Sequence, residues 1–299
     1  MPSELDCSGG IFIAPRLVYL RHSRIYSHSQ TQTRSRYHVH AMIDLVELKS
    51  PHAENPHVSK ISVIIAAAGN STRFGASEKK TFTMLAGTPV WVHSARVFAS
   101  HQQVQQIIVA ISPDDESYFV ERFESEIKRF DAKVVLGGAQ RSDSVANALA
   151  AVDSDSDLIA IHDGARPCID LALFQGVIDA AETHGAAIPA VPVNSTIKRS
   201  DNDQLVAETV DRSDLHLAQT PQVFDTKIIR DAYGRRGPLQ PTDEAQLLET
   251  LGIPVAIAPG SPFNIKITQP EDLRFAEACL AAIKPIQFDA GTDGDPLLR

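Results

Sequence analysis

The run ISVII at residues 61–65, followed by AAAGNSTRFGASEKK at residues 66–80, decides the fold class of this chain. An uninterrupted apolar run rich in Ile and Val is typical of a strand that is buried on both faces. The small residues that follow let a ligand approach the backbone, and Arg73 and Lys80 add positive charge. The loop lacks the second glycine of a dinucleotide fingerprint and the GK[ST] ending of a P-loop. The sequence therefore predicts an anion site of another kind, or an ordinary strand-to-loop junction with solvated basic residues.

Similar apolar runs recur along the chain and alternate with longer segments of helical periodicity. The predicted strands are residues 62–68, 106–112, 133–136, 158–162, 186–193 and 253–258, and the clearest helical segments are residues 113–130, 141–152 and 171–183. Strands that alternate with helices need crossover connections, which produce a mostly parallel sheet covered on both faces. The sequence therefore predicts one doubly wound α/β domain over residues 60–285.

Residues 194–211, NSTIKRSDNDQLVAETVD, interrupt this alternation. Two short strand-like pieces, STIKR and LVAETV, flank the polar turn SDNDQ, which is the pattern of a β-hairpin. The hairpin has too little apolar surface to form a core of its own. We therefore expect it to project from the domain and either to cover the active site or to grip another subunit.

Composition limits the classes of partner. The formal net charge of -9 and the isoelectric point of about 5.6 argue against general nucleic-acid binding, which usually requires a basic face. The three cysteines are odd in number and widely spaced, so they predict neither a disulfide framework nor a zinc cluster. No apolar stretch approaches the length of a membrane span. These features favour a protein of the cytoplasm with no membrane or nucleic-acid partner.

The two ends of the chain lack the pattern of a folded core. Between Ile11 and Ala41 there is no Asp or Glu, while arginines are scattered among Ser, Thr, Gln and His. Residues 1–59 therefore read as a poorly ordered extension: a disordered tail, a segment upstream of a working start at Met42, or a transit peptide, which would place the protein in a plastid. Residues 286–299 are polar and rich in glycine, and we expect a loose tail.

In open α/β sheets, ligands bind beyond the carboxyl ends of the strands, and the opening loop and three later features lie at such ends. The first of the later ones is LGGAQRSDSV at residues 136–145. Gly137 and Gly138 can pack flat against a nucleobase, and Ser142 or Ser144 can cap the next helix or bind ligand. The alternative is an ordinary strand–turn–helix with a serine N-cap.

The other two features bring charge to the same edge of the predicted sheet. In IHDGARPC at residues 161–168, Asp163 and Arg166 suit a divalent ion beside a phosphate, although a structural salt bridge between them is the alternative. In NIKITQPEDL at residues 264–273, Lys266 is predicted to lie in a strand that ends before a Pro-led helix. The alternative for Lys266 is a solvated residue on an edge strand.

The order of these features resembles that of one family. The order is the small-residue loop with its Arg and Lys, then GG..R.DSV, HD.ARP, the hairpin with TVDR and TPQ.F, and finally TDEA and NIK.T.PEDL. From about Lys60 to Lys284 the chain resembles the 2-C-methyl-D-erythritol 4-phosphate cytidylyltransferase family of the non-mevalonate isoprenoid pathway. Ribitol-5-phosphate cytidylyltransferases share part of the pattern, but HDGARPC and TPQVF favour the erythritol family.

The resemblance implies a Rossmann-like nucleotidyltransferase fold and the transfer of a cytidylyl group from CTP to 2-C-methyl-D-erythritol 4-phosphate, with release of pyrophosphate. It also implies Mg²⁺ as cofactor, with Asp163 as its ligand, and a homodimer whose subunits exchange hairpin arms. The alternatives are a cytidylyltransferase for another polyol phosphate, such as ribitol 5-phosphate, and a nucleotide-binding module without turnover.

The resemblance further assigns roles to individual residues. The implied catalytic residues are Arg73, Lys80 and Lys266. The implied nucleotide-binding residues are Ala67, Ala68, Gly69, Asn70, Ser71, Gly137, Gly138, Arg141, Ser144 and Gly164. The implied substrate-binding residues are Asp163, Arg166, Thr196, Arg212 and Thr220. Thr196 and Arg212 would reach the site of the partner subunit. The family often has Pro-Lys-Gln where this chain has Lys79-Lys80-Thr81, and the spacing from Arg73 assigns the catalytic role to Lys80.

Overall fold

The computed structural model describes residues 58–69, 74 and 78–283. Three of the implied site residues, Asn70, Ser71 and Arg73, therefore lie outside the described residues. So do the tail at residues 286–299 and all but the last two residues of the extension at residues 1–59.

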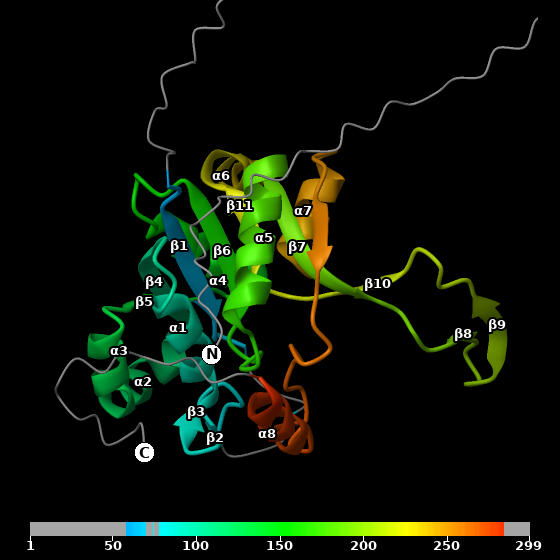
Figure 1. Cartoon of the computed structure of the whole chain (residues 1–299), viewed down its shortest axis with the longest axis horizontal. Helices are drawn as coiled ribbons and strands as arrows, with labels where there is room; N and C mark the ends of the chain where they lie inside the picture. The colour runs from blue at the N-terminus through cyan, green and yellow to red at the C-terminus, as the bar shows by residue number, and fades with distance from the viewer. Residues whose placement is uncertain (1–57, 70–73, 75–77, 284–299) are drawn as a thin grey trace, which may run out of the picture. The chain divides into compact units, whose positions relative to one another are not determined.

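An eight-stranded sheet forms the centre of the described part of the chain (Figure 1). Its strands are β1 (Ile61–Ala66), β4 (Val104–Ile111), β5 (Lys133–Leu136), β6 (Leu158–Asp163), β7 (Ala186–Pro192), β10 (His216–Ala218), β11 (Gln222–Asp225) and β12 (Ala256–Pro259). The order is β10-β7-β11-β6-β1-β4-β5, with β12 paired to β7. Pairs β1–β4, β1–β6, β4–β5 and β7–β12 are parallel, whereas β10 and β11 pair antiparallel with their neighbours. The prediction of a mostly parallel α/β sheet is confirmed.

Helices cover both faces of this sheet. In chain order the helices are α1 (Val90–Ala99), η1 (Pro113–Asp115), α2 (Glu116–Arg122), α3 (Glu124–Arg129), α4 (Arg141–Ala150), α5 (Leu171–His184), α6 (Thr226–Gly234), α7 (Glu244–Thr250) and α8 (Asp272–Ala282), of which α8 belongs to a separate cluster of buried residues rather than to either face of the sheet. Alternate residues of β1 enter different cores: Val63 packs with α1, α2 and α5, and Ile64 packs with α4, α6 and α7. Burial of both faces explains why β1 is apolar throughout.

The ends of the helices follow from local chemistry. Asp170 precedes α5, and its carboxylate accepts a hydrogen bond from Leu173 N at 2.8 Å. Gly185 ends α5 with a φ of 82°, a left-handed conformation that glycine adopts without steric cost. Asp225 and Asp243 cap α6 and α7 in the same way as Asp170 caps α5. These caps fix where each crossover turns back toward the sheet.

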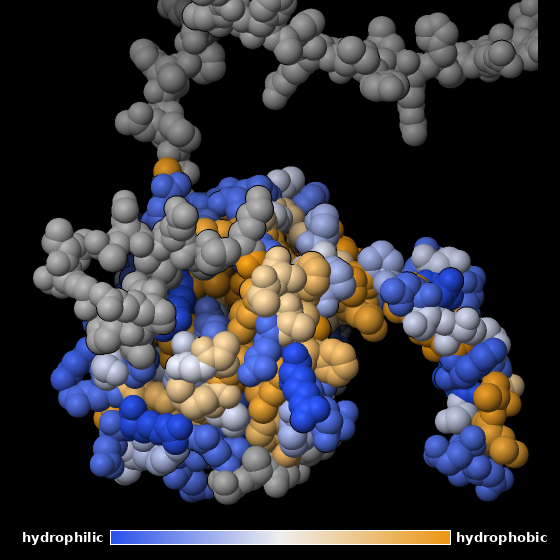
Figure 2. Space-filling model, turned by 60° about the horizontal axis from the view of Figure 1, so that its bottom comes forward, coloured by the Kyte–Doolittle hydropathy of each residue, from blue (hydrophilic) through white to orange (hydrophobic). Residues whose placement is uncertain are grey.

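Two small hairpins lie outside the main sheet. β2 (Met84–Leu85) pairs with β3 (Thr88–Pro89), and α8 packs on this pair through Leu85, Ile267 and Ala276. β8 (Ile197–Ser200) pairs with β9 (Val206–Val210) on an arm that Figure 1 shows extending away from the sheet. Figure 2 shows hydrophobic and hydrophilic side chains mixed along this arm, where Leu205 and Val206 are both more than half exposed.

The sequence-based prediction was wrong for two segments. Lys266 does not lie in a strand, because residues 264–268 pair with no strand of the sheet, and Ile267 N donates a single hydrogen bond to Ala165 O. The helical segment at residues 113–130 divides into η1, α2 and α3, since Phe123 leaves the helical conformation between α2 and α3. In the described part of the chain, no helix has the length and the apolar character needed to cross a membrane.

Candidate active site

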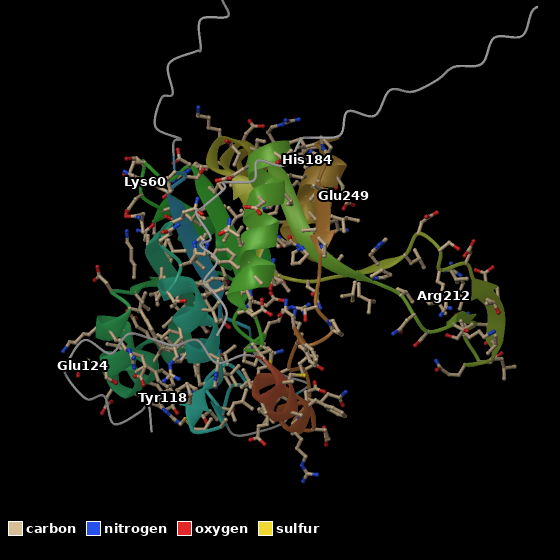
Figure 3. The ribbon with its side chains drawn as sticks, in the orientation of Figure 1. Lys60, Tyr118, Glu124, His184, Arg212 and Glu249 are labelled. Carbon is tan, nitrogen blue, oxygen red and sulfur yellow. The ribbon has the colours of Figure 1, made fainter. Side chains whose placement is uncertain are left out.

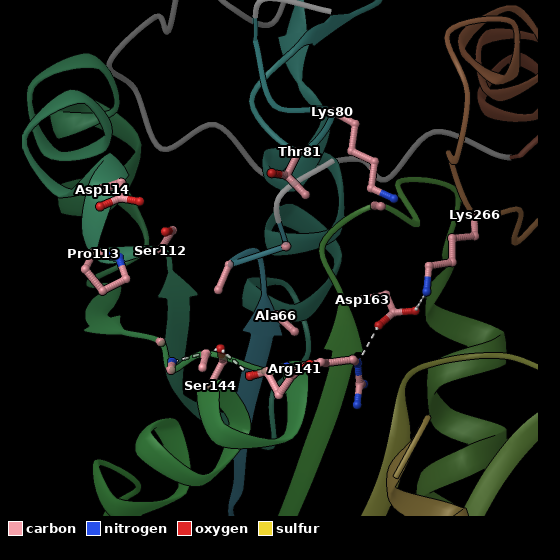
Figure 4. A pocket seen from close by; sticks show the side chains of 17 residues that line it. Ala66, Lys80, Thr81, Ser112, Pro113, Asp114, Arg141, Ser144, Asp163 and Lys266 are labelled. Atoms are coloured by element: carbon pink, nitrogen blue, oxygen red, sulfur yellow. Dashed lines mark hydrogen bonds and ion pairs between the residues drawn. The ribbon is translucent and has the colours of Figure 1, made fainter. Parts of the chain in front are cut away.

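A cavity of about 610 Å³ lies at the carboxyl ends of β1, β5 and β6 (Figure 4). It brings together nine of the residues predicted for the site, which are far apart in the sequence: Ala68, Gly69, Lys80, Gly137, Gly138, Arg141, Ser144, Asp163 and Lys266. A volume of this size is within the range of small-molecule sites. The prediction that the features at the strand ends meet in one place therefore agrees with the geometry.

The opening loop contributes the floor of this cavity. Ala68 and Gly69 line it, but Ala67 is buried, and its backbone N donates to Ala110 O at 2.8 Å. Gly164 does not line the cavity either. It packs against β1, with its N–H 3.0 Å from Ala66 O, and an added Cβ would lie 3.1 Å from that oxygen. Ala67 and Gly164 therefore fix the backbone beneath the cavity.

The glycine turn after β5 forms one wall. An added Cβ on Gly137 would lie 2.5 Å from Ser144 Oγ and 2.8 Å from Ala68 Cβ, distances that side chains cannot adopt. Ser144 Oγ accepts a hydrogen bond from Gly138 N and donates one to Gln140 O, both at 3.1 Å. Ser144 therefore shapes the turn. Neither it nor Ser142 is an N-cap, because α4 begins at Arg141 and its N-cap position is Gln140.

The chemistry-bearing end of the cavity is a cluster of charges around Asp163, the last residue of β6. Asp163 Oδ2 lies 2.7 Å from Lys266 Nζ and 3.7 Å from Arg166 Nε, and its Oδ1 lies 3.3 Å from Arg141 Nε. Burial by itself would raise the pKa of Asp163, but Arg141, Lys266 and Arg166 hold that pKa well below its ordinary value. The carboxylate is therefore ionised at neutral pH and surrounded by more positive than negative charge.

A second, smaller cavity of about 140 Å³ adjoins this cluster. It shares Arg141, Asp163 and Lys266 with the first cavity, and its other lining residues are Arg166, Ala218, Gln219, Thr220, Gln222, Thr242 and Asp243. The sequence did not predict a second cavity. Because Arg141, Asp163 and Lys266 line both cavities, they lie where the occupants of the two cavities would meet.

Arg166 and Thr220 are held in place by neighbouring backbone. Arg166 donates to Asn264 O at 2.8 Å and to Ala218 O at 3.4 Å, so it is anchored mainly by carbonyl groups and only weakly by Asp163. Thr220 Oγ1 accepts from Asp163 N at 3.0 Å and lies 3.2 Å from Nδ1 of the buried His162. The Thr220 hydroxyl therefore fixes the end of β6 beneath the charge cluster.

The two residues predicted on the hairpin are not near either cavity in the described part of the chain. Thr196 and Arg212 are exposed, and Arg212 donates to Asn194 O at the base of the arm. Figure 3 shows Arg212 on the arm, away from the sheet. If these residues act in a site, a single subunit does not bring them there.

Sequence reasoning missed several lining residues. Ser112, Pro113 and Asp114 follow β4 and line the first cavity. The rule that ligands bind beyond the carboxyl ends of strands, applied to the predicted strand at residues 106–112, would have found them. Sequence reasoning also missed the role of Glu244, a fully buried carboxylate that accepts hydrogen bonds from Arg141 NH1 and NH2 at 2.7 and 3.0 Å.

The donor set around Asp163 is compatible with a magnesium ion. Among residues 58–69, 74 and 78–283, no group of three or more His, Cys, Asp and Glu side chains could hold a metal ion. Mg²⁺ in nucleotide sites, however, usually takes one or two carboxylates and completes its shell with phosphate oxygens and water. One ionised carboxylate at the junction of the two cavities meets that requirement, provided that the other ligands arrive with the substrates.

Comparisons with known proteins agree with this geometry. A family model for IspD, 2-C-methyl-D-erythritol 4-phosphate cytidylyltransferase, matches residues 61–282. A protein of that name from Pelotomaculum thermopropionicum is 40% identical over 240 residues, which cover 78% of this chain and 100% of the relative. One from Rhodopirellula baltica is 43% identical over 233 residues, which cover 74% and 95%.

A solved structure extends the comparison from sequence to fold. The crystal structure of 2-C-methyl-D-erythritol 4-phosphate cytidylyltransferase from Thermus thermophilus has a TM-score of 0.63 and 34% sequence identity, and the match covers 74% of this chain and 99% of that chain. Residues 61–282, the region that the family model matches, contain both cavities and the hairpin arm. The chain therefore belongs to the 2-C-methyl-D-erythritol 4-phosphate cytidylyltransferase family.

Proposed function

We propose that this protein transfers the cytidylyl group of CTP to 2-C-methyl-D-erythritol 4-phosphate and releases pyrophosphate. The names of the relatives give the substrate class, and one observation carries the proposal to this chain. The larger and the smaller cavity meet at Arg141, Asp163 and Lys266, so two phosphorylated molecules would be joined where positive charge is concentrated.

The larger cavity suits the nucleotide. The Gly137–Gly138 turn leaves a flat wall without side chains for the cytosine base, and the loop at Ala68 and Gly69 lets the phosphates approach the backbone. Lys80 reaches the same cavity opposite this turn (Figure 4) and supplies positive charge for the triphosphate. On the basis of the family resemblance, we assign Arg73 the same role as Lys80, to supply positive charge for the triphosphate.

The smaller cavity suits the acceptor. Its polar lining, with Arg166, Thr220 and Asp243, matches the hydroxyl groups and the phosphate of a polyol phosphate. An oxygen of the acceptor phosphate attacks the α-phosphorus of CTP, a new P–O bond forms, and the bond to the bridging oxygen breaks as pyrophosphate leaves with its electron pair. A phosphate oxygen is already a nucleophile, so the reaction needs no general base from the protein.

Catalysis then consists of positioning and charge neutralisation. Lys80 and Lys266 would neutralise the charge that grows on the transferring and leaving phosphates, and Arg141 and Arg166 would orient the two reactants. Asp163 would hold Mg²⁺, which supplies charge neutralisation and a template for the phosphates when it is bound. The low pKa of Asp163 keeps this carboxylate ionised for that task.

The hairpin arm supports a dimer in this proposal. The β8–β9 arm has exposed hydrophobic side chains and too little surface for a core of its own, and Thr196 and Arg212 lie at its base away from the cavities. Two subunits that exchange arms would bring these residues to each other's acceptor cavity. The composition further supports a cytoplasmic setting, with residues 1–59 as an extension outside the catalytic domain.

The deciding experiment measures pyrophosphate release by the purified full chain with CTP, Mg²⁺ and a panel of polyol phosphates. We expect release with 2-C-methyl-D-erythritol 4-phosphate and a much smaller kcat/KM with ribitol 5-phosphate. A preference for another polyol phosphate would replace the acceptor in this proposal. Binding of CTP without pyrophosphate release on any acceptor would show a nucleotide-binding module.

A further inference from the structure

Arg141 is shared between two carboxylates in an unequal way. Its two terminal nitrogens donate to both oxygens of Glu244 at 2.7 and 3.0 Å, whereas only Nε faces Asp163, at 3.3 Å. A paired, two-point contact is the strongest arrangement for a guanidinium and a carboxylate. The main attachment of Arg141 is therefore to Glu244, and its contact with Asp163 is secondary (Figure 4 shows the Asp163 side).

Glu244 is built into the fold so that it cannot move toward the cavity. Its side chain is fully buried, and Oε1 also accepts a hydrogen bond from Tyr233 Oη at 3.0 Å. Its backbone N and that of Ala245 both donate to Gln222 Oε1 at 3.1 Å. Gln222 is in turn held by Asp243 Oδ2, 2.9 Å from its Nε2. These contacts fix the first turn of α7 and the direction of the Glu244 carboxylate.

Asp163 already has strong positive neighbours without Arg141. Lys266 contacts its Oδ2 at 2.7 Å, and Arg166 is 3.7 Å from the same oxygen. Asp163 Oδ1 has a long contact with Arg141 Nε at 3.3 Å; if Arg141 were not held by Glu244, its terminal nitrogens would be free to turn onto Oδ1 and replace this long contact with shorter, stronger ones. Because a cation such as Mg²⁺ needs an accessible carboxylate oxygen, that movement would compete with metal binding.

We propose that Glu244 is a positioning residue that holds Arg141 back from Asp163, so that the Asp163 carboxylate stays accessible to the divalent cation. The inference rests on the proposed function, because that function requires a cation at Asp163. It gives a task to the TDEA segment, residues 242–245, in which the glutamate touches neither cavity directly. Glu244 acts only through Arg141.

The test measures cation binding without turnover. Mn²⁺ is titrated by electron paramagnetic resonance into the full chain with CTP present and no acceptor. Replacement of Glu244 by the neutral amide in Glu244→Gln should raise the Kd for Mn²⁺ about tenfold, the effect of losing an outer-shell partner of a metal ligand. The matched control is Glu249→Gln, the same chemical change at an exposed position of the same helix (Figure 3), and it should leave the Kd unchanged.

A double variant separates this role from simple structural damage. In Arg141→Gln/Glu244→Gln the guanidinium that would compete for Asp163 is gone, so at CTP concentrations that saturate this variant, which are needed because Arg141 also lines the nucleotide cavity, the Kd for Mn²⁺ should fall from the Glu244→Gln value back toward that of the wild type. A merely structural defect would not be repaired by a second change in the same site. If Glu244→Gln does not fold, Glu244→Asp takes its place and should raise the Kd in the same direction, since the shorter side chain cannot hold both nitrogens of Arg141.

Failure of the inference about Glu244 can be distinguished from failure of the proposed function. Wild-type chain that binds Mn²⁺ with CTP but releases no pyrophosphate would count against the function and leave the role of Glu244 open to the same titration. A Kd for Glu244→Gln equal to that of the wild type overturns the inference. So does a weakening that persists in the double variant when thermal unfolding shows it to be folded.

Discussion

The ammonium group of Lys79 lies 2.5 Å from a carboxylate oxygen of Asp115, and both side chains are less than one-fifth exposed. The neighbouring Glu78 carboxylate accepts from Tyr118 Oη at 2.7 Å and lies 2.6 Å from Arg122 NH1. These contacts tie residues 78 and 79 to η1 and α2, immediately before Lys80 enters the cavity. The two adjacent lysines thus have different surroundings, one in an ion pair and one in the candidate site.

The difference predicts different effects for the two lysines. Lys80→Ala should lower kcat for pyrophosphate release by about 100-fold or more, the scale seen when an electrostatic stabiliser is lost. Lys79→Ala should change kcat by less than about tenfold but lower the free energy of unfolding by about 1 kcal/mol, because a partly buried ion pair is broken. Steady-state kinetics and urea unfolding of both variants check this, and the opposite ranking in kcat would assign the catalytic role to Lys79.

The glycine turn predicts a defect in nucleotide binding. In Gly137→Ala the new Cβ would overlap Ser144 Oγ and Ala68 Cβ, so the turn or these neighbours, which line the same cavity, must shift. We expect the KM for CTP to rise at least about tenfold, since a small misplacement of a binding wall is costly. Gly176→Ala is a matched control, because a Cβ there meets nothing within 4 Å. An unchanged KM in Gly137→Ala would show that this turn does not contact the nucleotide.

His162 predicts how stability depends on pH. Burial lowers the pKa of His162 to about 4, from an ordinary value of 6.5. Since the folded state binds this proton less tightly than the unfolded state, His162 stabilises the fold fully above pH 6.5, and this contribution is lost as the pH falls from about 6.5 to 4. The loss should amount to about 3 kcal/mol at most.

Urea unfolding at several pH values between 7 and 4 measures this loss. His162→Gln removes the titrating group and should flatten the pH dependence in that interval, although its stability at pH 7 is lower because the hydrogen bonds to Thr220 and Arg166 O are altered. Equal slopes for the two proteins between pH 6.5 and 4 would contradict the assignment.

The proposed exchange of hairpin arms predicts recovery of activity between two inactive variants. If each site combines Lys80 from one subunit with Arg212 from the other, the Lys80→Ala and Arg212→Ala homodimers should both be nearly inactive. In a mixed dimer both lesions fall in one site and the other site is intact. Random mixing gives about half mixed dimers, so about a quarter of wild-type activity should return.

Co-refolding of the two variants followed by the pyrophosphate assay tests the exchange. Each homodimer refolded alone is the control for residual activity. A mixture as inactive as its parents, after native mass spectrometry has confirmed the mixed dimers, would rule out a site that is shared in this way.

Much of the fold was predictable because its signals are local. The parallel strands are near-continuous runs of Val and Ile, and the position of β5 at residues 133–136 agrees with the sequence-based prediction. The antiparallel β11 was missed, since its four residues look like any short apolar run, and only pairing with β6 and β7 makes them part of the sheet. Register between distant segments is a tertiary property that periodicity does not encode.

The sequence by itself determined that glycines, small residues and charges follow the strands, and a parallel sheet brings such ends to one edge. Only the tertiary structure decided which of them meet. It brings Lys266 to Asp163 from a segment that lies in no strand, and it directs Arg141 chiefly to Glu244, a residue 103 positions away in the chain. The physical reason is that an ion pair depends on the distance between side chains, and burial of the surrounding core, rather than spacing in the sequence, sets that distance.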